Sequence, residues 1–128
     1  MNVKRTERGW AGHFICAGDC RFRRNTLLEY NDMSIVVSTV GLMNTPWKKG
    51  DKFYSGPFEE IGLNRHYETM AFHSNPSDTR YHDMDVTRQV DFESPWAISE
   101  IDADDKANDM HEKVVAEISA RLKAREVK

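Results

Sequence analysis

Two β-strand patterns joined by a tight turn occupy residues 21–40, and they constrain the fold more than any other part of the chain. Residues 21–30 alternate with the period of two that is typical of a strand. One face would carry Phe22, Arg24, Thr26, Leu28 and Tyr30, and the other Arg21, Arg23, Asn25, Leu27 and Glu29. Asn31 and Asp32 tolerate the positive φ that a two-residue hairpin turn requires, so residues 33–40 are predicted to return as the partner strand.

The partner strand contains three consecutive apolar residues, Ile35, Val36 and Val37. Consecutive apolar positions on a strand point to both faces of a sheet, so both faces must be covered. We therefore predict that this strand is central in the sheet and forms the core.

Further strand patterns and one long irregular stretch complete the first hundred residues. Short strands are predicted at residues 10–17, 67–73, 81–86 and 96–98, with a turn at 75–78. Residues 41–64 are rich in glycine, proline and lysine without a sustained period, and they are predicted to form a long loop. Loops of this length are more often functional than passive, although a tolerated insertion is the alternative.

The pattern changes to a helical period from about residue 104. Ala107, Met110, Val114, Ile118 and Leu122 are spaced three or four apart, which predicts an amphipathic helix over residues 104–126. Acidic residues in its first turn and basic residues in its last complement the helix dipole. Val115 widens the stripe, so the helix is expected to be able to meet a second helix as well as the sheet. The expected fold class is α+β, an antiparallel sheet of five to six strands with a long C-terminal helix.

Length and composition indicate one domain in a reducing compartment. The chain has 128 residues, with a basic tail expected over residues 1–9 and the sheet over 10–98. No apolar run approaches the ~18 residues needed to span a bilayer, and no signal peptide is recognisable, which favours the cytoplasm. Cys16 and Cys20 are too few for a disulfide scaffold and are expected to be thiols.

Motifs for catalysis or metal binding are weak. His13, Cys16 and Cys20 offer possible zinc ligands, but the second knuckle of a structural zinc site is missing, so neither a metal nor another cofactor is expected. Asp83 and Asp85 share a strand face and can be imagined as an acid and base pair, although a solvated face is the simpler interpretation. We therefore expect no enzyme activity.

Arginine, asparagine and aromatic side chains are interleaved on the predicted strands. Guanidinium groups bind phosphate in two-point fashion and aromatic faces stack on bases, so these residue types suit a nucleotide pocket. The alternative is that the arginines are solvated or paired with acids. Extended nucleic acid is a less suitable ligand, because the net charge is −3.

Five segments of the chain resemble small proteins encoded in phages and prophages, and in particular the first type of Thoeris anti-defence sponge. The segments are residues 9–16 (GWAGHFIC), 22–30 (FRRNTLLEY), 35–41 (IVVSTVG), 65–72 (RHYETMAF) and 108–115 (NDMHEKVV). The resemblance implies a homo-oligomer of the host cytoplasm, with a hexamer as the expected assembly. It also implies binding of cyclic ADP-ribose isomers, and in some members of cyclic oligonucleotides, between subunits and without cleavage.

The candidate site residues follow from side-chain chemistry, because the contact residues of these sponges cannot be aligned to this chain. They are Arg65, Tyr67, Phe72, Arg88 and Trp96 for an ADP-ribose-like ligand, and Arg23, Arg24 and Asn25 for a second phosphate ligand. Two alternatives remain open. One is a phage structural or regulatory domain that binds a protein partner, and the other is a small nucleotide hydrolase that uses His82, Asp83 and Asp85.

Overall fold

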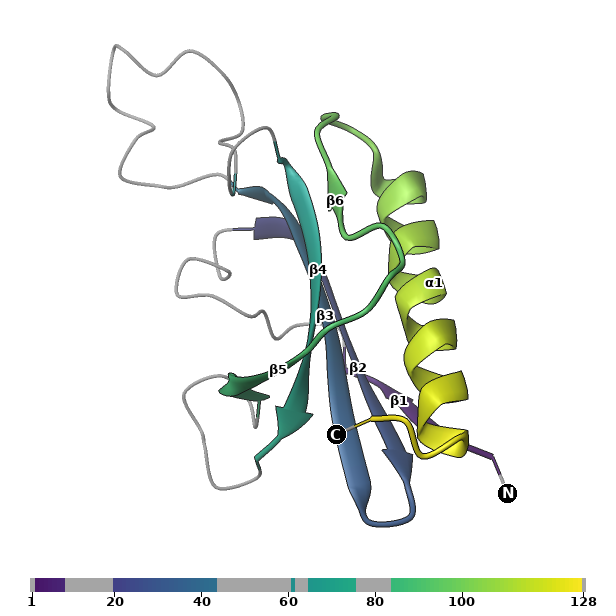
Figure 1. The fold of residues 1–128 in the computed structure, drawn as a ribbon. Helices are drawn as coiled ribbons and strands as arrows, with labels where there is room; N and C mark the ends of the chain where they lie inside the picture. Colours follow the sequence, from purple (N-terminus) through teal and green to yellow (C-terminus); the bar gives the residue numbers. More distant parts are fainter. Residues whose placement is uncertain (1, 9–19, 44–60, 62–64, 76–83, 128) are drawn as a thin grey trace, which may run out of the picture.

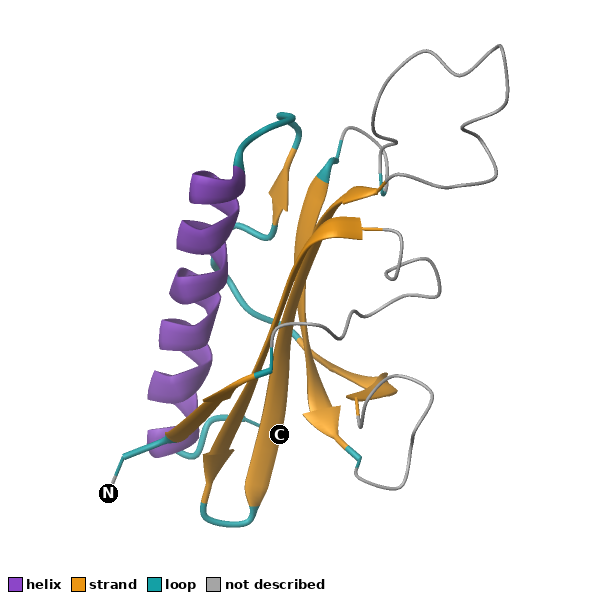
Figure 2. Ribbon diagram, turned by 180° about the vertical axis from the view of Figure 1, so that it is seen from behind, coloured by secondary structure: helices purple, strands orange, loops and turns teal. Residues whose placement is uncertain are grey.

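The computed structural model of the chain describes residues 2–8, 20–43, 61, 65–75 and 84–127. These residues form one antiparallel sheet with a single long helix along one of its faces (Figure 1). Figure 2 gives the view from behind, in which the helix again covers one face only. The α+β fold class predicted from the sequence is confirmed.

Six strands and the helix follow one another along the chain. They are β1 (Lys4–Glu7), β2 (Cys20–Tyr30), β3 (Met33–Met43), β4 (Tyr67–Ser74), β5 (Met84–Val90), β6 (Ala97–Ile98) and α1 (Asp104–Lys123). The sheet order is β1-β2-β3-β4-β5, and the short β6 pairs with β4. The predicted strands at 21–30, 33–40, 67–73 and 96–98 correspond to β2, β3, β4 and β6.

The hairpin of β2 and β3 has the predicted register. Tyr30 pairs with Met33 across the turn, and Asn31 has a φ of 55°, as a two-residue turn requires. β3 is the middle strand of the sheet, and Ile35, Val36 and Val37 are 0% exposed. The prediction of a central strand buried on both faces is confirmed.

Several boundaries differ from the expectation. The basic tail contains β1, which pairs with the edge of β2 even though all its residues are polar and exposed and three of the four are charged. β3 continues through Gly41 to Met43, into the expected loop. The strand expected at 81–86 is described from Met84 and runs on to Val90. The strand expected at 10–17, most of the loop at 41–64 and the turn at 75–78 lie outside the described residues.

The pairing of β5 with β4 contains an irregularity. The pairing changes register between Phe72 and Ser74. At this point the Asp85 carboxylate accepts hydrogen bonds from the backbone N–H (3.1 Å) and the hydroxyl (2.6 Å) of Thr87. Such a bond between a side chain and the backbone two residues on supports the irregular backbone locally, and Val90 at the end of β5 packs in the same cluster as the helix residues.

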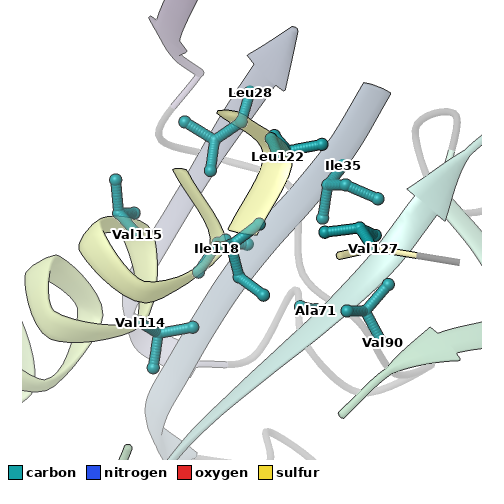
Figure 3. Close-up of a cluster of buried hydrophobic side chains, with 10 residues drawn as sticks. Leu28, Ile35, Ala71, Val90, Val114, Val115, Ile118, Leu122 and Val127 are labelled. Carbon is teal, nitrogen blue, oxygen red and sulfur yellow. The ribbon is translucent and has the colours of Figure 1, made fainter. Parts of the chain in front are cut away.

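The helix buries the predicted stripe against the sheet. Ala107, Met110, Val114, Ile118 and Leu122 are all buried. Val115, expected to be able to contact a second helix, packs instead in the same cluster as Leu28 and Ile35 (Figure 3). Figure 3 also shows Val127, beyond the helix, closing the far end of this cluster. Within the described residues, no helix is long and apolar enough to cross a membrane.

Candidate ligand-binding site

Arg65 and Trp96 meet at the end of the sheet where β6 pairs with β4. The guanidinium carbon of Arg65 lies 4.9 Å from the centroid of the Trp96 ring, which is a cation–π contact. The two residues are far apart in sequence, and the pairing of Tyr67 with Ile98 brings their segments together. Arg65 Nε also donates to the carboxylate of Glu68 at 3.2 Å, so the guanidinium is held in place from two sides.

A cleft of about 200 Å³ lies beside Trp96. Its lining residues are Thr69, Met70, Gln89, Asp91, Phe92 and Trp96. The two aromatic rings offer stacking surfaces, while Gln89 and Asp91 offer hydrogen-bonding groups. The volume is below the ~300 Å³ at which pockets for whole ligands begin, so the cleft suits one ring system of a larger molecule.

Trp96 and Ile101 are the exposed large hydrophobic side chains of the described residues, and Trp96 is the more exposed of the two. Its exposed fraction is 46%, against 42% for Ile101. Its backbone is nevertheless fixed, because the carbonyl of Trp96 accepts a hydrogen bond of 2.8 Å from the N–H of Thr69. An aromatic ring held in this way can receive a flat ligand without first becoming ordered.

Tyr67 and Phe72, both predicted for the same pocket, point to opposite faces of β4. Tyr67 is fully buried on the helix side, where its ring meets Phe22 edge-on at 5.6 Å. Phe72 is buried on the other side with Val36 and Met84. Tyr67 and Phe72 therefore pack in two different clusters, and neither lines the cleft beside Trp96.

Arg88 is exposed on β5 and is absent from the lining of the Trp96 cleft in the described part of the chain. Of the first predicted set, the structure therefore brings together Arg65 and Trp96 only. Glu68 contacts Arg65, and Gln89 and Asp91 line the cleft with Trp96. No local pattern indicated these three residues, because their proximity depends on strand pairing.

The second predicted set is also divided by the sheet. Arg24 points to the helix face, where its Nη2 donates to Glu7 at 2.7 Å and its Nη1 lies 3.0 Å from Glu112. Asn25 points to the opposite face and is 0% exposed. Arg23 alternates with Arg24 and therefore shares the face of Asn25.

Arg8 completes a polar group with Asn25 that the sequence did not indicate. Arg8 Nε donates to Asn25 Oδ1 at 2.7 Å, and Arg8 N donates to the Asn25 carbonyl at 2.6 Å. Asn25 Nδ2 is buried without an acceptor among the described residues. A buried donor left unsatisfied costs ~1–3 kcal/mol, so this position favours an incoming oxygen.

An ion-pair network joins β1, β2 and the helix on the helix face of the sheet. Arg5 Nη1 donates to Glu112 at 2.8 Å, and Arg24 bridges Glu7 and Glu112. The hydrogen bond from Arg5 lowers the pKa of Glu112 to about 2, and the same bond raises the pKa of Arg5. Arg24 is therefore paired with acidic residues, which was the alternative to phosphate binding.

His111 is the centre of a buried hydrogen-bonded chain between the helix and the sheet. Its Nε2 lies 2.7 Å from the hydroxyl of Thr26, and its Nδ1 lies 2.7 Å from that of Thr39. Burial, aided by the nearby Arg24, lowers the pKa of His111 to about 4, so the ring is neutral at pH 7. His111 lies four residues after Ala107 and so belongs to the buried stripe of the helix. This spacing is the sequence feature from which its burial could have been predicted.

Among the described residues, those considered for catalysis or metal binding form neither a catalytic centre nor a metal site. Asp85 accepts hydrogen bonds from Thr87, while His82, Asp83, His13 and Cys16 lie outside the described residues. Cys20 is a buried thiol. No group of three or more metal-binding side chains is found among the described residues.

No family model, no curated protein and no solved structure matches this chain. The resemblance to phage anti-defence sponges therefore stays a prediction.

Proposed function

We propose that this protein binds a small nucleotide signal and sequesters it without cleavage, as its resemblance to the first type of Thoeris anti-defence sponge implies. The ligands would be cyclic ADP-ribose isomers, and cyclic oligonucleotides are the second candidate class. The proposal places the protein in the host cytoplasm as a homo-oligomer, with a hexamer as the expected assembly.

The observation that carries the proposal is the contact of Arg65 with Trp96, whose ring lines the cleft. The indole offers a face for a base, and stacking on an aromatic side chain contributes ~1–3 kcal/mol per base. A guanidinium next to that face suits the phosphates that a nucleotide brings with it. The bond to Glu68 keeps the guanidinium beside the ring before any ligand arrives.

The group around Asn25 provides support from the other predicted set. Asn25 Nδ2 is a buried donor beside the guanidinium of Arg8, and Arg23 shares its face of the sheet. Donors and positive charges together favour an anionic oxygen. Phosphate is the anion that the proposed ligands would supply.

A thermal-shift screen followed by chromatography tests the proposal. The purified protein is heated with ADP-ribose, cyclic ADP-ribose isomers, and cyclic di- and trinucleotides. A ligand at ~100 times its Kd should stabilise the fold by ~2.7 kcal/mol and be recovered intact after heating. Trp96→Ala should abolish most of the shift, while Trp96→Phe should retain part of it because phenylalanine also stacks.

Ile101→Ala is the matched control, since Ile101 is a large exposed apolar residue that does not line the cleft. A loss of the shift in both variants would point to general destabilisation. Recovery of an altered ligand would indicate a hydrolase and overturn the proposal.

A protein-interaction domain is the second candidate. The observation that favours it is the exposure of Trp96 and Ile101, because exposed large apolar residues are enriched where proteins meet. The absence of a thermal shift with every nucleotide would favour this candidate over the sponge.

A further inference from the structure

The segment that carries Trp96 is an irregular connection between β5 and β6. It spans residues 91–96 and belongs to neither a helix nor a strand. Phe92 anchors it to the main core cluster. The remaining backbone needs other partners, because irregular segments do not satisfy their own hydrogen bonds.

Glu117 of the helix supplies most of these partners. Its Oε2 accepts a hydrogen bond from the N–H of Glu93 at 2.8 Å. Its Oε1 accepts two bonds from Ser94, one from the N–H at 2.8 Å and one from the hydroxyl at 2.6 Å. Burial alone would raise the pKa of Glu117, but the bonds from Ser94 and Glu93 outweigh it and lower the pKa. The carboxylate is therefore ionised when it holds the segment, and charge-assisted bonds are the stronger kind.

Arg121, one helical turn further on, holds the beginning of the same segment. Its Nη1 donates to the carbonyl of Asp91 at 2.6 Å, and it lies 3.7 Å from Glu117. At the other end of the segment, the carbonyl of Trp96 accepts the hydrogen bond from the N–H of Thr69 in β4. The connection is thus fixed by the helix at one end and by the sheet at the other.

A hollow of about 600 Å³ lies where this segment faces the helix. Its lining residues are Asp91, Phe92, Glu93, Glu117, Arg121 and Glu126. Close packing therefore does not fill the space beside Glu93 and Glu117. The hydrogen bonds of Glu117 are what hold this part of the backbone in place.

We propose that Glu117, assisted by Arg121, is a positioning residue for the ligand site: it fixes residues 91–96 so that Trp96 and Asp91 face the cleft before ligand binds. This inference rests on the proposed nucleotide-binding function and adds to it a residue that does not line the cleft. Its physical basis is preorganisation, because a segment that is already ordered loses no further conformational entropy when the ligand binds.

Glu117→Gln is the test, because it preserves the size of the side chain and removes the charge. The amide nitrogen cannot accept a hydrogen bond, so the bonds to Glu93 and Ser94 cannot all survive. Glu112→Gln is the matched control. Glu112 lies on the same helix as Glu117 and is also an ion-paired glutamate, but its partners are Arg5 of β1 and Arg24 of β2, away from residues 91–96. Ser94→Ala removes the hydroxyl bond alone and should give a smaller effect.

Two measurements on each variant are required. The first is amide hydrogen exchange in the protein without ligand, in which Glu93 and Ser94 should exchange about tenfold faster in Glu117→Gln than in the wild type. The second is the Kd for cyclic ADP-ribose, which should rise about fivefold or more. Glu112→Gln should leave both unchanged.

The outcomes separate this inference from the function on which it rests. A wild type that binds none of the nucleotides overturns the proposed function, and the positioning role with it. A wild type that binds cyclic ADP-ribose, together with an equally tight Glu117→Gln variant, overturns the positioning role alone. Unchanged exchange at Glu93 and Ser94 in Glu117→Gln would also overturn it. Faster exchange with weaker binding supports it.

Discussion

The phenol of Tyr67 donates a hydrogen bond of 2.7 Å to the carboxylate of Asp104 and thereby ties strand β4 to the first turn of the helix. The same oxygen accepts a bond of 2.9 Å from the N–H of Ala103. Ala103 is the N-cap residue and has no side chain that can cap the helix. A tyrosine from the sheet performs that role, which explains why this polar group tolerates complete burial.

Tyr67→Phe should destabilise the protein by about 1–3 kcal/mol, because it leaves the N–H of Ala103 and the carboxylate of Asp104 without their shared partner. Urea denaturation measures this free energy of unfolding. Tyr30→Phe is the control, since Tyr30 is only half-buried beside the hairpin turn, and it should cost much less. Equal effects in the two variants would remove the role assigned to Tyr67 as a cap.

Gly41→Ala should destabilise the fold by about 1–3 kcal/mol or prevent it from forming. A Cβ at this position would lie 2.3 Å from Cδ2 of Tyr67 and 2.9 Å from the carbonyl oxygen of His66. Because one of these neighbours is a side chain, the cost should fall in a Tyr67→Ala background, in which only the backbone clash remains. A double-mutant cycle followed by denaturation checks this, and an identical cost in both backgrounds would contradict it.

The free energy of unfolding should fall as the pH drops from about 6.5 to 4. The pKa of His111 is lowered from 6.5 to about 4 by burial first and by Arg24 second. Because the unfolded chain binds the proton more readily, the contribution of His111 is complete above pH 6.5 and is lost by pH 4. Such a shift corresponds to about 3 kcal/mol.

The hydrogen-bonded chain explains why protonation of His111 is unfavourable. Glu7 can only accept, so Thr26 donates to it at 2.9 Å and must itself accept from Nε2 of His111. Nδ1 of His111 then accepts from Thr39, which in turn accepts from Thr69 at 2.6 Å. A second proton on the ring would force Thr39 to turn its hydroxyl away.

Denaturation at a series of pH values, in the wild type and in His111→Gln, measures this effect. The variant should lose the slope between pH 6.5 and pH 4. Among the charged groups near His111, Glu112 titrates below this window, because its pKa is about 2, and the pKa of Glu7 is lowered from its ordinary value. Arg5, whose pKa is raised, and Arg24 remain charged throughout. A wild type whose stability is flat across the window would refute the assignment of a neutral His111.

Arg125→Gly should stabilise the protein by about 0.5–1 kcal/mol. Arg125 follows the helix with a φ of 58°, its N–H donates to the carbonyl of Leu122, and the N–H of Glu126 donates to that of Arg121. This ending favours glycine, because L-residues are strained in the left-handed region. Arg125→Ala keeps the strain and serves as the control, and thermal denaturation should rank glycine above both alanine and arginine.

Local patterns determined the hairpin, the central strand and the helix of this protein. The alternation in residues 21–30, the turn at Asn31 and the apolar run at Ile35 each depend on neighbours a few residues away. The same holds for the stripe that begins at Ala107. Such features can be predicted because period and turn chemistry are properties of the sequence itself.

Tertiary structure alone decided where the side chains of the candidate site lie. The contact of Arg65 with Trp96 exists because β6 pairs with β4, and no local pattern encodes that pairing. The separation of Tyr67 from Phe72 follows once the face of β4 that meets the helix is known. β1 forms from mostly charged residues because the edge of β2 offers unpaired backbone groups. The hydrogen bonds between Ser94 and Glu117 form only when the helix is packed on the sheet. Hydrogen bonds between distant segments cost chain entropy and form only when the packed core has brought the segments together, so the core had a local signature in the sequence and the site did not.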